Sequence, residues 1–191
     1  MIINKISMFF INTNPQIINL IKFIVSYVYN FKETNIAKHN KYSETVRDTE
    51  THIKDAANWL LESQKNSVDS GYSRCYSLYS KRWDKGYIET TGYIIPSMIN
   101  VGKVFHENKY IQSAMVASEW ILEIQNGDGS FNDIDSGLPQ VFDTGQCLIG
   151  LIFLFKKTSD QRFLLAATKA GDWLCNSQDK SGTWTKFSYN N

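Results

Sequence analysis

The chain has 191 residues, with 20 Lys and Arg against 19 Asp and Glu, which gives a net charge of +1. This balance, without a run of basic residues, argues against a nucleic-acid-binding surface. The three cysteines are odd in number and lack metal-type spacing, so we expect reduced thiols and a cytoplasmic location.

The first 31 residues are the most apolar part of the chain. Their longest apolar stretch, residues 16–31, is shorter than the roughly 20 residues of a membrane-spanning helix, and Lys22 interrupts it. Pro15 splits the apolar region, and no small-residue cleavage site follows, which disfavours a signal peptide. We predict an N-terminal apolar helix and polar linker at 1–43, with the helix packed on the remaining domain, 44–191. Weak membrane association through this segment is the alternative.

Apolar residues at helical spacing predict a helix over residues 44–64, with Ser43 as its N-cap. A long loop follows at 65–87, and its large aromatic residues include Tyr72, Tyr76, Tyr79 and Trp83. A loop of this length in a compact array is uncommon unless it covers a site. We therefore expect this loop to border the functional site.

Four more helices are predicted, over residues 91–105, 109–125, 143–156 and 160–178. Pro96 fits the first of them only in its opening turn, so that helix is expected to begin close to Gly92. Helix 143–156 is apolar around much of its circumference, which predicts an inner layer more buried than helix 160–178. Cys147 and Cys175 are expected to be small core residues.

The second half of the chain contains one pattern twice, 53 residues apart without a gap. Its helix starts are Thr91-Gly92 and Thr144-Gly145, and its helix endings, including a looser first copy, are Trp59…Gln64, Trp120…Gln125 and Trp173…Gln178. A repeat of this length holds two helices and their connections, so it predicts an array of helical hairpins. The three tryptophans are predicted to be core residues, and Gln125 and Gln178 to bond to backbone at the turns.

With the N-terminal helix, the predicted elements make three helical hairpins. A closed ring built from such hairpins needs roughly twice as many. The sequence therefore predicts an all-α fold that is about half of a ring. The apolar sides of the terminal repeats would then be uncovered, so we expect self-association.

The helix endings resemble the repeats of α/α-toroid proteins, which include squalene cyclases, protein prenyltransferases and six-hairpin glycosidases. The helix starts at residues 87–96 and 141–146 resemble uncharacterised bacterial six-hairpin-like proteins associated with cell-surface polysaccharide genes. That family has Pro at the position of Ile88 and Asn at that of Asp143, and it continues for several more hairpins. The resemblance covers about residues 48–184 and implies a partial α/α toroid.

Two activities within this fold are disfavoured by the residues present. Squalene cyclases use an Asp-rich motif, which is missing here. Prenyltransferases bind zinc through Asp, Cys and a distant His, but the histidines here lie early in the chain or at a helix end. Residues 126–135 depart from the EF-hand pattern and predict a simple turn. We expect neither a metal nor a cofactor.

Two carboxylates carry the main functional hypothesis. Glu89 and Asp143 each stand at the start of a predicted inner helix. Inner helices of a toroid pack closely, so these carboxylates would lie roughly 6–10 Å apart, which includes the separation in inverting glycosidases. They are therefore the candidate catalytic residues. The alternative for each is an N-cap that only stabilises its helix.

Aromatic and polar residues near the same helix ends form the candidate substrate-binding set: Tyr72, Trp83, Tyr87, Tyr93 and Gln146. Aromatic faces bury the apolar faces of sugar rings, although packing between hairpins explains aromatic residues equally well.

The first functional hypothesis is a protein that binds or acts on a saccharide, in cell-surface polysaccharide metabolism. The second is a non-catalytic toroid fragment or interaction scaffold. A third, weaker hypothesis is a protein that handles isoprenoids, like the terpenoid cyclases. The sequence leaves open whether the chain is an enzyme.

Overall fold

The computed structural model describes residues 28, 31–32, 35 and 48–189. Residues 48–189 form five α-helices and one short hairpin: α3 (Thr49–Lys65), β1 (Tyr76–Ser77), β2 (Arg82–Trp83), α4 (Ile88–Val104), α5 (Asn108–Ile124), α6 (Val141–Thr158) and α7 (Gln161–Asn176). The all-α class predicted from sequence is confirmed. The predicted N-terminal helix falls, apart from four positions, outside the described residues. Among the described helices, none combines the length and hydropathy needed to cross a membrane.

The chain divides into two compact units, one of Val46–Tyr76 and Trp83–Asn191, and one of Met1–Thr45 and Ser77–Arg82. The fold described below is that of the larger unit.

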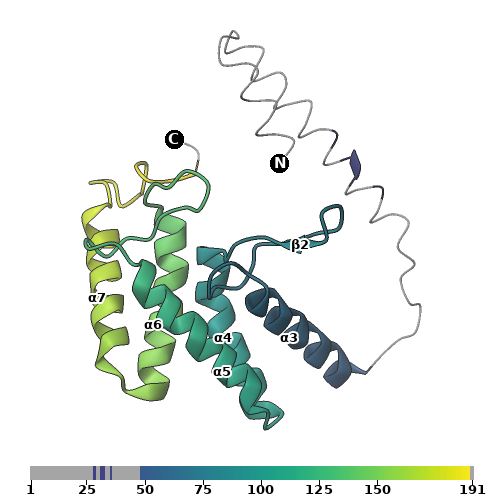
Figure 1. Cartoon of the computed structure of the whole chain (residues 1–191). Helices are drawn as coiled ribbons and strands as arrows, with labels where there is room; N and C mark the ends of the chain where they lie inside the picture. The colour runs from purple at the N-terminus through teal and green to yellow at the C-terminus, as the bar shows by residue number, and fades with distance from the viewer. Residues whose placement is uncertain (1–27, 29–30, 33–34, 36–47, 190–191) are drawn as a thin grey trace. The chain divides into compact units, whose positions relative to one another are not determined.

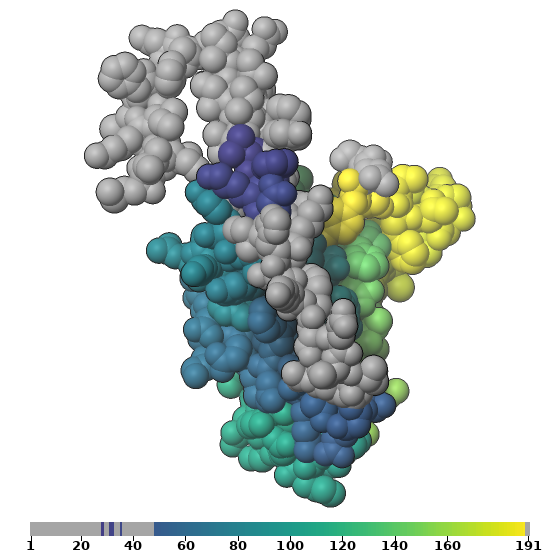
Figure 2. Space-filling model, turned by 90° about the vertical axis from the view of Figure 1, so that its right-hand side faces the viewer, coloured from purple at the N-terminus to yellow at the C-terminus, as the bar shows by residue number. Residues whose placement is uncertain are grey.

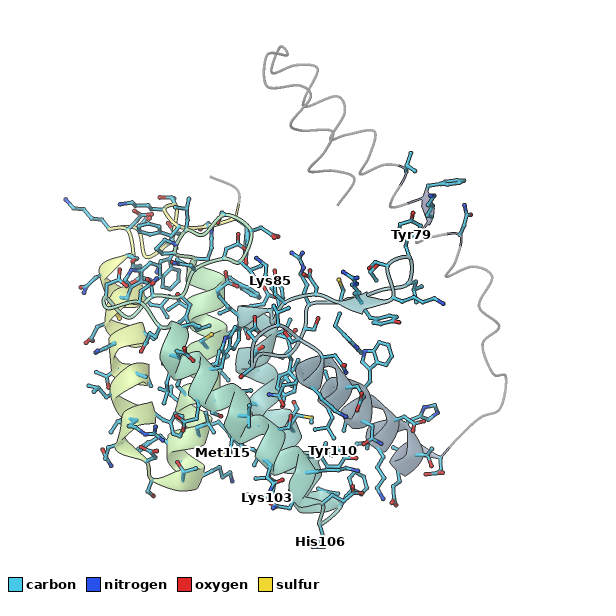
Figure 3. All side chains as sticks on the ribbon, in the orientation of Figure 1. Tyr79, Lys85, Lys103, His106, Tyr110 and Met115 are labelled. Atoms are coloured by element: carbon cyan, nitrogen blue, oxygen red, sulfur yellow. The ribbon has the colours of Figure 1, made fainter. Side chains whose placement is uncertain are left out.

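The helices of the larger unit form two layers. Helices α4 and α6 lie side by side, α5 packs on α4, and α7 packs on α6 (Figure 1). Helix α3 contacts α5 and α4. The inner layer is therefore α4 and α6, and the outer layer is α3, α5 and α7, as expected for consecutive helical hairpins. His106, in the left-handed region with φ of 55°, marks the α4–α5 turn in Figure 3.

Helix α3 begins later than predicted. Its N-cap is Asp48, whose Oδ1 accepts a hydrogen bond from the Thr51 amide at 2.9 Å, so the prediction of Ser43 as the cap is wrong. The loop after α3 is partly ordered as the β1–β2 hairpin. Asp48 is the cap of α3 because its carboxylate accepts a hydrogen bond from a free amide of the first helical turn.

Polar contacts join α3 to α5. Gln64 Nε2 donates to the carbonyl oxygens of Ser70, in the loop, and Ser113, on α5, at 2.9 and 3.0 Å. The Tyr110 hydroxyl of α5, labelled in Figure 3, donates to Asn58 Oδ1 on α3 at 3.0 Å. These bonds hold two outer helices that share few apolar contacts.

The same glutamine contact recurs at the next hairpin. Gln125 Nε2 donates to the carbonyl oxygens of Gly129, in the turn, and Ala166, on α7, at 3.1 and 2.9 Å. Gln178 Nε2 donates to the carbonyl of Gly182 at 2.8 Å. The predicted backbone role of both glutamines is confirmed. Gln125 also ties its turn to the following outer helix.

A second recurring contact pins each loop to the start of an inner helix. The hydroxyl oxygens of Thr91 and Thr144 accept hydrogen bonds from the backbone amides of Tyr72 and Phe131, at 3.1 and 3.0 Å. All four residues are fully buried. The buried amides of Tyr72 and Phe131 need hydrogen-bond acceptors. The two threonine hydroxyls supply them in place of backbone carbonyls.

The prediction that the second helix begins close to Gly92 is wrong, because α4 begins at Ile88 and contains Pro96 in its interior. Proline has no N–H, so it deprives the Gly92 carbonyl, four residues earlier, of its usual helical donor. That carbonyl instead faces Gly150 of α6, where an added Cβ would collide with it. A Cβ added at Gly92 would lie 2.6 Å from the Gln146 carbonyl oxygen. The inner helices therefore cross backbone against backbone, a contact that favours Cα–H···O bonds.

Helix α6 is more buried than α7, as predicted. Three of the 14 residues from Asp143 to Lys156 are exposed, against ten of the 19 from Asp160 to Gln178. The expected burial all round the helix is wrong, however. One face of α6 exposes large apolar side chains: Phe142, Ile149 and Ile152. Helix α6 is buried only where it meets its neighbours.

The crossing of α4 and α6 yields a stability prediction. Gly92→Ala should lower the free energy of unfolding by roughly 1–3 kcal/mol, because its methyl group meets rigid backbone. Gly145, the repeat counterpart, has nothing within 4 Å of an added Cβ. Gly145→Ala should therefore raise the free energy of unfolding by about 0.5–1 kcal/mol through helix propensity alone. Urea denaturation followed by circular dichroism measures both, and effects of the same sign would contradict the crossing.

Candidate functional site

A buried carboxylate lies in the first turn of α6. Asp143 is 1% exposed, and the Tyr189 hydroxyl lies 3.0 and 2.9 Å from its two oxygens and donates to them. Tyr189 reaches this position because the chain folds back after α7. The Val141 amide, at the start of α6, donates to the Phe187 carbonyl at 2.9 Å. In Figures 1 and 2 this C-terminal segment, in yellow, lies over the upper end of the green α6.

Neither candidate catalytic carboxylate caps its helix. The N-cap residues are Tyr87 for α4 and Gln140 for α6, and neither makes a side-chain capping hydrogen bond. Glu89 and Asp143 lie inside the first turns, at the second and third helical positions. The capping explanation for both residues is therefore wrong.

Burial dominates the electrostatics of Asp143. Loss of solvation raises the pKa of this carboxyl to about 6, against the lowering effect of the Tyr189 hydrogen bond. The negative charges of Glu89 and Asp133 raise this pKa further. The two carboxylates from adjacent inner helices are thus close enough to interact. Among the described residues, neither Glu89 nor Asp143 forms an ion pair with a Lys or Arg.

Three tyrosines surround this pair. Desolvation raises the pKa of the Tyr87 hydroxyl, and the charges of Glu89 and Asp143 add to the effect. Desolvation and the charge of Glu89 raise the pKa of Tyr93, whose side chain is 43% exposed. Desolvation and the Asp143 carboxylate raise the pKa of Tyr189. All three hydroxyls therefore remain protonated donors near neutral pH.

Two of the predicted substrate-binding aromatics lie elsewhere. Tyr72 is fully buried, and its hydroxyl lies 2.9 Å from Ser113 Oγ, so it is a core residue with no face for a ligand. The Trp83 ring packs on Trp59 and Tyr76, with centroids 4.7 and 5.0 Å away. The structure thus separates Tyr72 and Trp83 from the set that groups Glu89 with Tyr87 and Tyr93.

The predicted core role of the repeat tryptophans holds for two of three. Trp120 and Trp173 are buried, at 9% and 8% exposure, whereas Trp59 is 55% exposed. Trp59 belongs to the first and loosest copy, and its ring packs on Tyr76 and Trp83 of the loop that follows α3. The prediction for Trp59 is wrong.

Two glutamines lie beside the carboxylate. Gln146, one turn after Asp143, is half-buried, and its backbone forms the wall against Gly92. Gln140, the N-cap residue of α6, is 9% exposed, and its Oε1 has no hydrogen-bond partner among the described residues. Buried acceptors are rarely left unpaired. Gln140 therefore marks a place where a donor from solvent or a ligand would be stabilised.

Cys147 lies buried close to the start of α4. Burial raises the pKa of the Cys147 thiol well above its ordinary value, so it remains neutral, and its Sγ lies 3.6 Å from the Ile88 carbonyl. Cys175 is exposed, contrary to prediction. Within residues 48–189 and the four earlier described positions, no three His, Cys, Asp or Glu side chains lie together as metal ligands.

The predicted turn at residues 126–135 is confirmed. Asp128 Oδ1 accepts from the amide and hydroxyl of Ser130, at 3.0 and 2.6 Å, and Asn126 Nδ2 donates to Asn132 at 2.7 Å. The turn's polar side chains thus bond to one another.

The sequence pattern predicted Glu89 and Asp143 at the starts of neighbouring inner helices, and both residues lie in the first turns of α4 and α6. It missed Tyr189 and Asp133. Tyr189 lies beyond residue 184, where the repeat pattern ends, and the return of the C-terminal segment to α6 brings it to Asp143. Nothing in its local sequence indicates that return.

No protein-family model matches the chain, and no curated protein matches it either. Its architecture is therefore described from the internal repeat and the packed hairpins alone.

The raised pKa of Asp143 gives a pH prediction. Its folded-state pKa of about 6 exceeds the ordinary Asp value of 3.8, so the folded state binds more protons between these values and loses stability as pH rises through them. Asp143→Asn should remove this loss, which is at most roughly 3 kcal/mol. The stability difference between variant and parent should therefore grow from about pH 4 to pH 6.5 and then level off. Urea titrations at several pH values measure it, and a constant difference would contradict the assignment.

Proposed function

We propose that the starts of α4 and α6 form a saccharide site of an α/α-toroid-like protein, as the repeat motifs and their resemblance imply. The single observation that carries the proposal is the buried Asp143 carboxyl, held by Tyr189 and within the electrostatic influence of Glu89. A structural role as a helix cap does not account for it.

The chemistry of these groups suits a hydroxyl-rich ligand. A carboxyl whose pKa lies near 6 exchanges a proton close to neutral pH and can serve as a general acid or base. Glu89 supplies a second carboxylate on the adjacent helix. Tyr93 offers an exposed ring face and Tyr87 a hydroxyl group, which are usual partners of sugars. The Arg74 guanidinium lies over the Tyr87 ring, 5.9 Å from its centroid. The unpaired Gln140 acceptor provides a further hydrogen-bonding position for a ligand hydroxyl.

An interaction scaffold is the second candidate function. The observation in its favour is that Tyr189 occupies both oxygens of Asp143, so a ligand must displace it or bind beside it. A surface hollow of about 490 Å³ lies elsewhere, between the outer helices α5 and α7. Its Arg162 is already paired with Glu119 and Asp160, and Glu123 and Lys169 also line the hollow.

Substitution of Glu89 tests the saccharide site. Glu89→Gln should abolish binding of, or activity on, surface-type polysaccharides, while the free energy of unfolding changes little because Glu89 caps nothing. Binding is measured by calorimetry or a glycan array, and turnover by release of reducing ends. Asp143→Asn should abolish the same signal, and Tyr189→Phe should alter its pH dependence by removing the donor to Asp143.

Tyr72→Phe is the matched control. It removes one hydroxyl from a buried tyrosine far from solvent, so it should cost about 1 kcal/mol of stability and leave binding intact. A Glu89→Gln variant that binds saccharide like the parent would rule out the paired carboxylates. Loss of binding in Tyr72→Phe as well would point to a general folding effect.

A further inference from the structure

The repeat lets each position of the α4–α5 hairpin be compared with its counterpart 53 residues later in α6–α7. Gly92 of α4 is covered by the backbone of α6, as described above. Its counterpart Gly145 has nothing within 4 Å of an added Cβ. The same helical position is thus covered in the first hairpin and open in the second.

Two further pairs behave in the same way. An added Cβ at Gly129 would collide with the Lys169 carbonyl of α7, whereas one at Gly182 meets nothing within 4 Å. Both glycines have positive φ, 96° and 83°, so the turn has the same form in both places. Gln125 bonds to its own turn and to α7, but Gln178 bonds only to its own turn among the described residues.

The apolar surface follows this pattern too. Ile99 of α4 is 3% exposed, and its counterpart Ile152 of α6 is 39% exposed. The face of α6–α7 formed by Gly145, Ile152, Gln178 and Gly182 is therefore the counterpart of the face by which α4–α5 receives α6–α7. We call it the acceptor face.

We propose that the acceptor face docks a further helical hairpin of the same repeat, in the register in which α4–α5 receives α6–α7. The inference does not depend on the saccharide site. Continuity with the interface between the two hairpins argues for this occupant over an unrelated one. The docked hairpin carries a small residue opposite Gly145, as Gly150 stands opposite Gly92. Its outer helix offers a backbone carbonyl to Gln178, as Ala166 does to Gln125.

One difference modifies the match. Ile149 stands where α4 has Pro96. The Gly145 carbonyl therefore keeps a possible helical donor that Gly92 has lost. A docked helix can then approach Gly145 closely only because glycine has no side chain. A substitution of Gly145 is therefore a direct test of docking.

The test uses the full chain with residues 126–178 duplicated directly after Gln178. The added segment then follows Gln178 as it follows Gln125 in the natural chain. The longer chain should gain the ellipticity of two helices and melt in one transition, with Tm raised by at least about 4 °C. Gly145→Leu in the first copy should abolish this rise. In the natural chain the same substitution should leave Tm unchanged or slightly higher.

Gly127→Leu is the matched control, because Gly127 also has nothing within 4 Å of an added Cβ but lies in the turn before α6, away from the acceptor face. It should leave Tm unchanged in both chains. A separate, lower melting transition for the added hairpin would overturn the proposal. A rise in Tm that survives Gly145→Leu would overturn it as well, since the hairpin would then be held without this face.

Discussion

The close crossing of α4 and α6 is the contact on which the rest of the fold depends. Gly92 and Gly150 bring two backbones together, and Pro96 frees the Gly92 carbonyl to face the neighbouring helix. Side chains at either glycine would push the inner helices apart. Because Glu89 and Asp143 each lie within the first turn of these helices, their mutual electrostatic influence follows from this crossing. The outer helices only need to cover the inner pair.

Hydrogen bonds to the backbone then set the register between hairpins. Apolar packing alone tolerates sliding along a helix, whereas a buried hydroxyl or amide has few places where it is satisfied. Thr91 and Thr144 fix the loops at the inner-helix starts, and Gln64 and Gln125 fix the outer helices. The same residues that mark the repeat in the sequence therefore determine how its copies align in space.

The sequence predicts the structural features that the copies of the repeat share. Its predictions are wrong at positions where one copy has different neighbours from the others. Helices and their order follow from apolar spacing, and Trp120 and Trp173 are buried as the repeat predicts. Trp59 is not, because burial depends on a neighbour and not on the motif itself. The prediction from Pro96, that the helix begins close to Gly92, is wrong for another reason. The usual rule places proline in a first turn, but tertiary packing at Gly92 outweighs the helix bond that Pro96 removes.

The site is harder to predict because its pieces come from three separate segments. Glu89 and Asp143 are visible as helix starts, but Tyr189 joins them because the C-terminal segment returns to α6, where the Val141 amide bonds to the Phe187 carbonyl and the Phe142 and Tyr189 rings meet. That segment also explains how a carboxylate without a cationic partner persists. The Tyr189 hydroxyl donates to Asp143, and the helix N-terminus adds partial positive charge. These contacts offset part of the desolvation but leave the pKa of Asp143 raised.

An uncharged residue of similar size would be more stable in the position of Asp143, and the structure shows no capping or ion-pair role for the carboxyl among the described residues. The proposed role of Asp143 in proton exchange or ligand binding rests on this arrangement.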